Sequence, residues 1–221
     1  MPIISFCSPK GGAGKTTSAI VLATTLSQGA TVEVIDADPA ARACAWAQRG
    51  NVPENMTIRT SRGERHIQDE IAEAAARVDV VIVDLEGAAT NLNSMVLAES
   101  DLVVVPAGDE QQDVDAAVDA LAQIALLERS LRREIRSAVL FGRTKAAVKA
   151  RNARDLNGLM RANVETFSVE LHDRTAFSSL HSLGGSLYDM SPKEVGGLPR
   201  AIANAEAFAA EIIERLGGAG K

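Results

Sequence analysis

A glycine-rich stretch at residues 10–17 places the strongest constraint on how this chain can fold. It reads Lys-Gly-Gly-Ala-Gly-Lys-Thr-Thr, follows the apolar run Ile3–Cys7, and leads into a run from Thr16 to Ser27 with apolar residues at helical spacing. This order is that of a strand, a loop and a helix. Glycines allow backbone N–H groups to converge on phosphate oxygens, and the helix adds the positive end of its dipole. The stretch therefore predicts a phosphate-binding loop with a nucleotide as its ligand.

Two side chains of this loop have a defined chemistry. Lys15 can neutralise phosphate charge, and the hydroxyl of Thr16 can hold Mg²⁺. Pro9 stands where the usual pattern has glycine, and Lys10 is an additional lysine before the glycine pair. A glycine-rich turn without a ligand is the alternative, which the strand and helix on either side disfavour. The residues predicted to bind the nucleotide are Lys10, Gly11, Gly12, Ala13, Gly14, Lys15, Thr16 and Thr17.

Acidic residues follow two further strand-like runs. Thr31–Ile35 leads directly into Asp36 and Asp38, and Asp84 lies near the end of the apolar run Val78–Leu85. Open α/β sheets bind their ligands at the carboxyl ends of the strands, so we expect these carboxylates near the phosphate loop. Aspartate pairs also cap helices, which is the alternative for the first two. Beside a phosphate loop, the set favours a Mg²⁺–nucleoside triphosphate site.

The loop sequence Lys-Gly-Gly-x-Gly-Lys-Thr-Thr resembles that of the ParA/MinD family of deviant Walker A ATPases. The resemblance covers most of the chain and is strongest over residues 3–39, clear again over 79–106, and weaker around His172–Phe177. The short N-terminus and the residues Phe-Cys-Ser before the loop are similar to small ParA-type members, including a transfer-DNA-processing relative. The residues that follow Asp84, Leu85-Glu86-Gly87, lack the proline that is common at this point in plasmid-partition relatives.

The resemblance implies ATP as the nucleotide, Mg²⁺ as the metal, and a role for each polar residue of the site. Lys10 would cross a dimer interface to the partner's nucleotide, Lys15 would contact the β and γ phosphates, and Asp38 would orient or activate the attacking water. These three residues form the implied catalytic set. The residues implied to hold the metal or its waters are Thr16, Asp36 and Asp84.

Strand-like and helix-like runs alternate along the chain. We therefore expect an α/β fold, a mostly parallel twisted sheet with helices on both faces, of the P-loop NTPase type. With 221 residues and 46% hydrophobic content, the chain is most simply one domain over residues 1–221. Further strands are expected at Leu102–Pro106, Ser137–Phe141 and Val164–Val169, and further helices at Ile67–Ala76, Val114–Leu127 and Leu198–Leu216. Residues 51–65 are expected to form a polar link, and Gly108–Asp113 an acidic loop before the helix at Val114.

Positive charge is concentrated in one part of an acidic chain. The formal net charge is −6, yet residues 129–161 contain ten Lys or Arg and only two acids. On a helix through Arg151 to Arg161, the side chains of Arg151, Arg154 and Arg161 would share a solvent-exposed face. A merely solvated face is the alternative, but such a patch suits non-specific contact with duplex DNA, and the 3% aromatic content disfavours stacking on single-stranded bases. The predicted DNA-contacting residues are Lys145, Lys149, Arg151, Arg154 and Arg161.

The remaining residue types predict little further chemistry. His66, His172 and His181 lack the spacing of metal ligands, so no transition-metal site is expected. The two cysteines, Cys7 and Cys44, are expected to be free thiols. No run is long and apolar enough for a membrane span, and the first strand begins directly after Met1-Pro2, so a cytoplasmic protein is predicted.

The function predicted is that of a ParA-type ATPase. An ATP-dependent homodimer would bind non-specific double-stranded DNA and segregate plasmid or other DNA cargo, and a ParB-like or other partner would stimulate hydrolysis. Positioning of a protein cluster and a metabolic ATP-dependent synthetase on the same fold are the alternatives. A MinD-like membrane switch would need a basic terminal amphipathic helix, and Glu206, Glu211 and Glu214 oppose it, so no membrane partner is expected.

Overall fold

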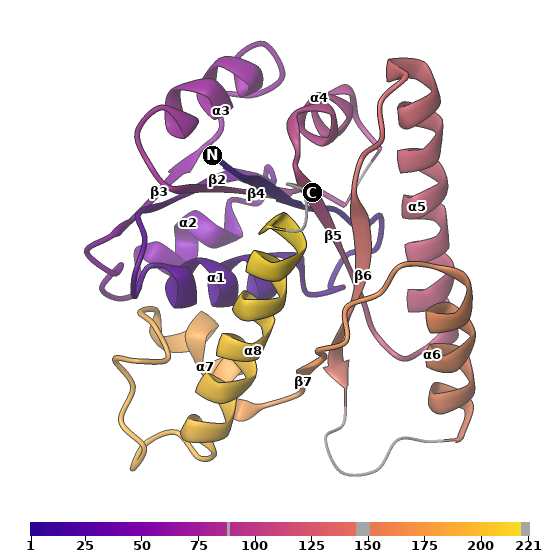
Figure 1. Ribbon diagram of the computed structural model, residues 1–221. Helices are drawn as coiled ribbons and strands as arrows, with labels where there is room; N and C mark the ends of the chain where they lie inside the picture. Colours follow the sequence, from indigo (N-terminus) through magenta and orange to yellow (C-terminus); the bar gives the residue numbers. More distant parts are fainter. Residues whose placement is uncertain (88, 145–150, 218–221) are drawn as a thin grey trace.

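The computed structural model describes residues 1–87, 89–144 and 151–217, in which strands and helices alternate (Figure 1). The strands are β1 (Ile3–Phe6), β2 (Val32–Ala37), β3 (Met56–Thr60), β4 (Val80–Leu85), β5 (Leu102–Ala107), β6 (Ser137–Thr144) and β7 (Leu171–His172). The helices are α1 (Lys15–Leu26), α2 (Arg42–Ala47), α3 (Ile67–Ala75), α4 (Asn91–Glu99), α5 (Gln111–Leu131), α6 (Arg151–Asn163), α7 (Thr175–Leu183) and α8 (Leu198–Gly217).

The described strands form one seven-stranded sheet in the order β3-β2-β4-β1-β5-β6-β7, and every pairing is parallel. β1 lies between β4 and β5, so the segment that leaves its carboxyl end starts at the centre of the sheet. The register sets Asp84 of β4 beside Phe6 of β1 and beside Asp36 of β2. The sheet thus brings the two predicted acidic strand ends to the edge where the glycine-rich loop begins.

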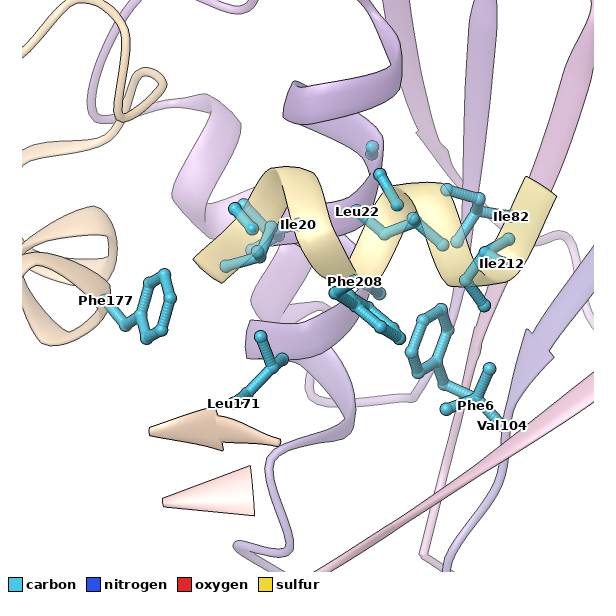
Figure 2. Packing of buried hydrophobic residues seen from close by; sticks show 14 of the residues in the cluster. Phe6, Ile20, Leu22, Ile82, Val104, Leu171, Phe177, Phe208 and Ile212 are labelled. Atoms are coloured by element: carbon cyan, nitrogen blue, oxygen red, sulfur yellow. The ribbon is translucent and has the colours of Figure 1, made fainter. Parts of the chain in front are cut away.

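Helices cover both faces of this sheet, as the fold class predicts (Figure 1). One core cluster joins the sheet to α1, α2, α7 and α8, and a second joins its other face to α3, α4, α5 and α6. In the first cluster Phe208 and Ile212 of α8 point toward Phe6, and all three side chains are fully buried (Figure 2). Each such side chain contributes on the order of 2 kcal/mol of burial free energy. This packing fixes the central strand that carries the loop.

Most expected elements are confirmed, although α4 and α7 were not expected and three predicted segments differ. The predicted strand Val164–Val169 is wrong, because α6 continues to Asn163 and only an isolated bridge from Thr166 to Val139 follows. The predicted helix starting at Val114 begins three residues earlier, at Gln111. The expectation of a polar link over residues 51–65 missed β3, an edge strand with one buried, two half-buried and two exposed residues.

The two cysteines and the apolar character of the helices can also be compared with the sequence predictions. Cys7 and Cys44 are free thiols, and burial raises the pKa of Cys7 to about 11, which makes it a poor nucleophile. Among the described helices, none has both the length and the apolar character needed to cross a membrane.

Candidate nucleotide-binding site

The glycine-rich loop connects β1 to α1 at the carboxyl edge of the sheet. Gly14 has φ +98° and caps the N-terminus of α1, and Gly12 has φ +79°. A side chain with a Cβ atom is strained in this left-handed region, so both positions require glycine. The first turn of α1 therefore begins immediately at the loop, with the positive end of its dipole directed there.

Lys15 is buried inside the loop. Its ammonium Nζ donates to the carbonyl oxygens of Ser8 at 3.1 Å and Lys10 at 3.5 Å. Burial lowers the pKa of Lys15, while the nearby carboxylates of Asp84 and Asp38 raise it in part. The loop thus holds one cation among main-chain carbonyls, close to two acids, at the place where phosphate oxygens would bind.

Thr16 and Asp84 form the most direct side-chain contact of the site. The Thr16 hydroxyl donates to Asp84 Oδ2 at 2.7 Å, although the two residues lie 68 positions apart in the sequence. Burial raises the pKa of Asp84 to about 7, and the hydrogen bond from Thr16 opposes this shift. The other carboxylate oxygen of Asp84, Oδ1, is buried and has no hydrogen-bond partner among the described residues. The Thr16 hydroxyl and the unpaired Oδ1 of Asp84 are oxygen ligands of the kind that fit Mg²⁺ or its bound waters.

Asp36 lies near the carboxyl end of β2, and Asp38 lies on the loop that follows this strand. Asp36 is fully buried, and its two oxygens accept from the backbone N–H groups of Asp38 at 3.3 Å and Cys44 at 2.9 Å. Asp38 Oδ1 accepts from the N–H of Ala40 at 2.8 Å. Asp36 thus shapes the segment that presents Asp38. Its role in supporting metal-bound water stays a prediction.

Lys10 lies on the outer side of the loop and pairs with α5. Its Nζ is 2.7 Å from Asp113 Oδ1, and the Lys10 side chain is 29% exposed whereas that of Asp113 is 3% exposed. The expected acidic loop Gly108–Asp113 is therefore partly helical, with Asp113 in the first turn of α5. Within the described chain, Lys10 is held by a carboxylate of its own subunit, a contact that the sequence did not suggest.

Gly87 packs over the phosphate loop from the β4 side. A Cβ atom at this position would lie 3.3 Å from the carbonyl oxygen of Pro9 and 3.5 Å from Lys15 Nζ. The main chain at Gly87 thus lies against Lys15, the lysine that would contact phosphate. This segment, Leu85-Glu86-Gly87, lacks the proline of partition relatives. A larger residue at 87 would crowd the loop.

A hollow of about 100 Å³ adjoins the loop on the side of α7. Its lining includes Gly14 and Thr17 from the loop, His172 and Arg174 near β7, and His181 from α7. The Thr17 hydroxyl lies 2.7 Å from His181 Nε2, and burial lowers the pKa of that imidazole. His181 is thus a site residue that the sequence did not identify, since α7 itself was not expected.

Arg161 is exposed, and its guanidinium also has partners within the chain, while its contact with DNA stays a prediction. Its guanidinium lies 5.2 Å above the Phe141 ring, Nη2 is 3.0 Å from Glu170 Oε1, and Nη1 donates to the Phe167 carbonyl oxygen at 2.7 Å. These contacts tie α6 to β6 and the following segment, so Arg161 stabilises the fold. The other predicted DNA-contacting residues, Lys145, Lys149 and the side chains of Arg151 and Arg154, lie outside the described part of the chain.

Comparison with known sequences identifies the family. The family model described as VirC1 protein matches residues 1–199. A protein named ParA from Rhizobium radiobacter is 37% identical over 218 residues, which cover 98% of each chain. This chain belongs to the VirC1 family of ParA/MinD-type ATPases. A VirC1 protein from Rhizobium rhizogenes is 28% identical over 190 residues, 83% of this chain and 82% of that relative.

Solved structures agree on the fold of this ParA-type chain. An ATP complex of McdA from Cyanothece has a TM-score of 0.77 and 18% identity, and the match covers 96% of each chain. A plasmid partition protein from Borrelia burgdorferi bound to AMPPNP has a TM-score of 0.74 and 18% identity over 97% of this chain and 99% of that one. At this identity the likeness concerns the architecture, which confirms the predicted P-loop NTPase fold.

Proposed function

We propose that this protein is a Mg²⁺-dependent ATPase that forms a dimer with ATP and positions DNA cargo. The observation that carries the proposal is the convergence of Lys15, Thr16 and Asp84 at the carboxyl edge of the sheet, with Asp84 Oδ1 left without a partner. Bound Mg²⁺ would neutralise phosphate charge there. Thr16 and Asp84 would hold the ion or its waters, and Lys15 would bind the β and γ phosphates.

Residues of the chain itself would prepare the hydrolytic step. Asp38 would accept a hydrogen bond from the attacking water, and the backbone bonds to Asp36 would keep that loop in place. Lys10 would reach the nucleotide of the partner subunit once it has left Asp113.

The assignment of ATP binding is tested with Lys15→Ala and Thr16→Ala. Lys15→Ala should abolish productive ATP binding, because the phosphates lose their fixed cation, and Thr16→Ala should remove the dependence of phosphate release on Mg²⁺. Thr24→Ala is the matched control, since Thr24 is a buried threonine of the same helix whose hydroxyl donates to the carbonyl oxygen of Ile20. Unchanged ATP affinity and hydrolysis in Lys15→Ala would refute the proposed site.

DNA cargo is proposed because the 37% identical relative is named ParA and because of the basic segment at residues 129–161. The assay is duplex-DNA binding across a salt series with ATP, with ADP and without nucleotide. Reversal of Arg151 and Arg154 to glutamate should weaken binding to all sequences alike and reduce the logarithmic salt slope by about 0.9 for each lost phosphate contact. Arg161 is left out of this variant, because its contacts are internal.

Positioning of a protein cluster is the second candidate function. A curated relative from Gloeobacter kilaueensis, 25% identical over 185 residues, is named for the maintenance of carboxysome distribution. Both functions require ATP-dependent dimers and a partner protein that stimulates hydrolysis. If the wild-type protein dimerises with ATP but never binds duplex DNA, the protein-cargo function replaces the DNA-cargo function. ATP turnover that requires a small molecule would indicate a metabolic synthetase instead.

A further inference from the structure

The edge of the sheet opposite the nucleotide site carries a groove that the proposed ATPase cycle does not use. Two hollows of about 570 and 930 Å³ lie beside the amino-terminal ends of β4, β1, β5 and β6, and they adjoin because both are lined by Glu134 and Arg136. The end of α8 forms one wall, with Ile213 and Leu216 in the first hollow and Glu211 and Glu214 in the second. We call these two hollows together the amino-edge groove.

One half of the amino-edge groove is apolar. Its lining includes Ile4, Leu26, Val80 and Ile212, and Ile213 on the rim is 58% exposed. An exposed aliphatic side chain beside an apolar hollow costs free energy in water, and this cost is removed when a partner's apolar side chain covers it. The volume of 570 Å³ is sufficient for one or two large aliphatic side chains of a partner.

The other half is acidic, and its charge is not balanced from within. Five carboxylates and two arginines line the second hollow, whereas two of each line the first. Arg215 pairs with Glu165 and Glu211, and Arg136 donates to the carbonyl oxygen of Arg215. Glu134 and Glu214 are exposed and form no ion pair with any described residue. Glu134, which lines both hollows, and Glu214 of the second hollow are therefore available to a cationic partner.

We propose that the amino-edge groove binds a cationic amphipathic segment of a partner protein. Aliphatic side chains of the segment would fill the hollow beside Ile213, and its lysines or arginines would lie beside Glu134 and Glu214. Nucleic acid and anionic lipid surfaces are repelled by the same carboxylates. A second copy placed symmetrically would bring each acidic rim toward its own equivalent, which is unfavourable for a dimer of like charges.

The position of the groove determines when such a segment can bind. The groove and the nucleotide site lie at opposite ends of β4, which has Val80 at the groove and Asp84 at the nucleotide site. The two sites are therefore a strand length apart, roughly 15 Å. A segment in the groove therefore touches neither Lys15 nor Asp38. Binding at this edge should tether a partner in every nucleotide state, in contrast to a contact that forms only in the ATP-bound dimer.

The test uses a fluorescein-labelled 12-residue peptide of lysine and leucine in helical amphipathic order, and a peptide of glutamate and leucine with the same pattern. Fluorescence anisotropy with the full chain at low salt should show binding of the lysine peptide only, with equal affinity in ATP, in ADP and without nucleotide. Glu134→Lys/Glu214→Lys should weaken this binding at least about tenfold, because two attractions become repulsions. Ile213→Ser should weaken it to a smaller extent.

Matched variants separate the groove from the overall negative charge. Glu54→Lys/Glu194→Lys makes the same change in net charge at exposed positions elsewhere, and Leu126→Ser removes a side chain that is also 58% exposed, from α5. Both should bind the lysine peptide as the wild type does. Equal weakening by groove and control variants, or no binding by the wild type, would overturn the proposal.

Discussion

A substitution at Asp113 that frees Lys10 in advance should make ATP-dependent dimerisation more favourable. If Lys10 crosses to the partner's nucleotide, the ion pair with Asp113 at 2.7 Å must first break, and it leaves a carboxylate that is only 3% exposed without its cation. A fully buried pair costs about 3–5 kcal/mol when one partner is removed. Because the Lys10 side chain is 29% exposed, we take about 1–2 kcal/mol for each subunit.

Asp113→Asn removes this cost and keeps the shape of the side chain. Two subunits together gain about 2–4 kcal/mol, so the dissociation constant of the ATP-bound dimer should fall by roughly 30- to 1,000-fold. Sedimentation velocity across a protein concentration series, with ATP in excess, measures the constant directly. Asp119→Asn is the matched control, since Asp119 is an exposed aspartate on the same helix.

Two outcomes would refute this reasoning. Asp113→Asn could keep its thermal stability and ATP affinity and yet dimerise no more tightly than the wild type. The gain could also persist in Lys10→Ala/Asp113→Asn, which has no lysine to release. In either case the pair of Lys10 with Asp113 does not restrain the dimer.

Three further predictions concern hydrolysis, pH and packing. Asp38→Ala should bind ATP but hydrolyse it about 10²–10⁴-fold more slowly, so that light scattering detects an accumulating ATP-bound dimer; normal phosphate release would argue against a role in water activation. The carboxyl of Asp84 has a pKa of about 7 in the folded chain against 3.8 when unperturbed, so its charge destabilises the nucleotide-free fold above pH 7, and this cost disappears as pH falls toward 4. Urea unfolding of Asp84→Asn in EDTA should therefore show a gain of at most about 4 kcal/mol at pH 8 and none near pH 4; a gain independent of pH would contradict this. Gly184→Ala should lose more than about 2 kcal/mol, because Gly184 has φ +70° and a Cβ atom there would lie 2.4 Å from the N atom of Gly50, whereas Gly158→Ala on α6, with open space around it, should gain about 0.5–1 kcal/mol.

The phosphate loop and the acidic strand ends could be predicted because their signals are local. Lys15 and Thr16 belong to one uninterrupted stretch, and Asp84 ends an apolar run that only a buried strand explains. The meeting of Thr16 with Asp84 then follows from parallel strands whose carboxyl ends share an edge. For such features, periodicity and turn chemistry are sufficient.

The missed features depend on contacts between distant segments. Asp113 was placed in a loop because helix starts are weakly encoded, and its pairing with Lys10 joins residues 103 positions apart. His181 lies on α7, a short helix whose place beside Thr17 depends on packing against α1 and α2. The exposed face predicted for Arg161 follows from helical periodicity, which carries no information about the Phe141 ring beneath it. Each missed contact concerns a side chain whose partner the local pattern does not specify.

The strand order also determines when the chain can acquire its site during synthesis. β1 is synthesised before both of its neighbours in the sheet, β4 and β5, which end at Leu85 and Ala107. Until these two strands have left the ribosome, the strand before the phosphate loop lacks its partners, and its apolar side chains stay exposed to aggregation or to chaperones. The part of the sequence that is easiest to recognise is thus translated before the strands that hold it in place.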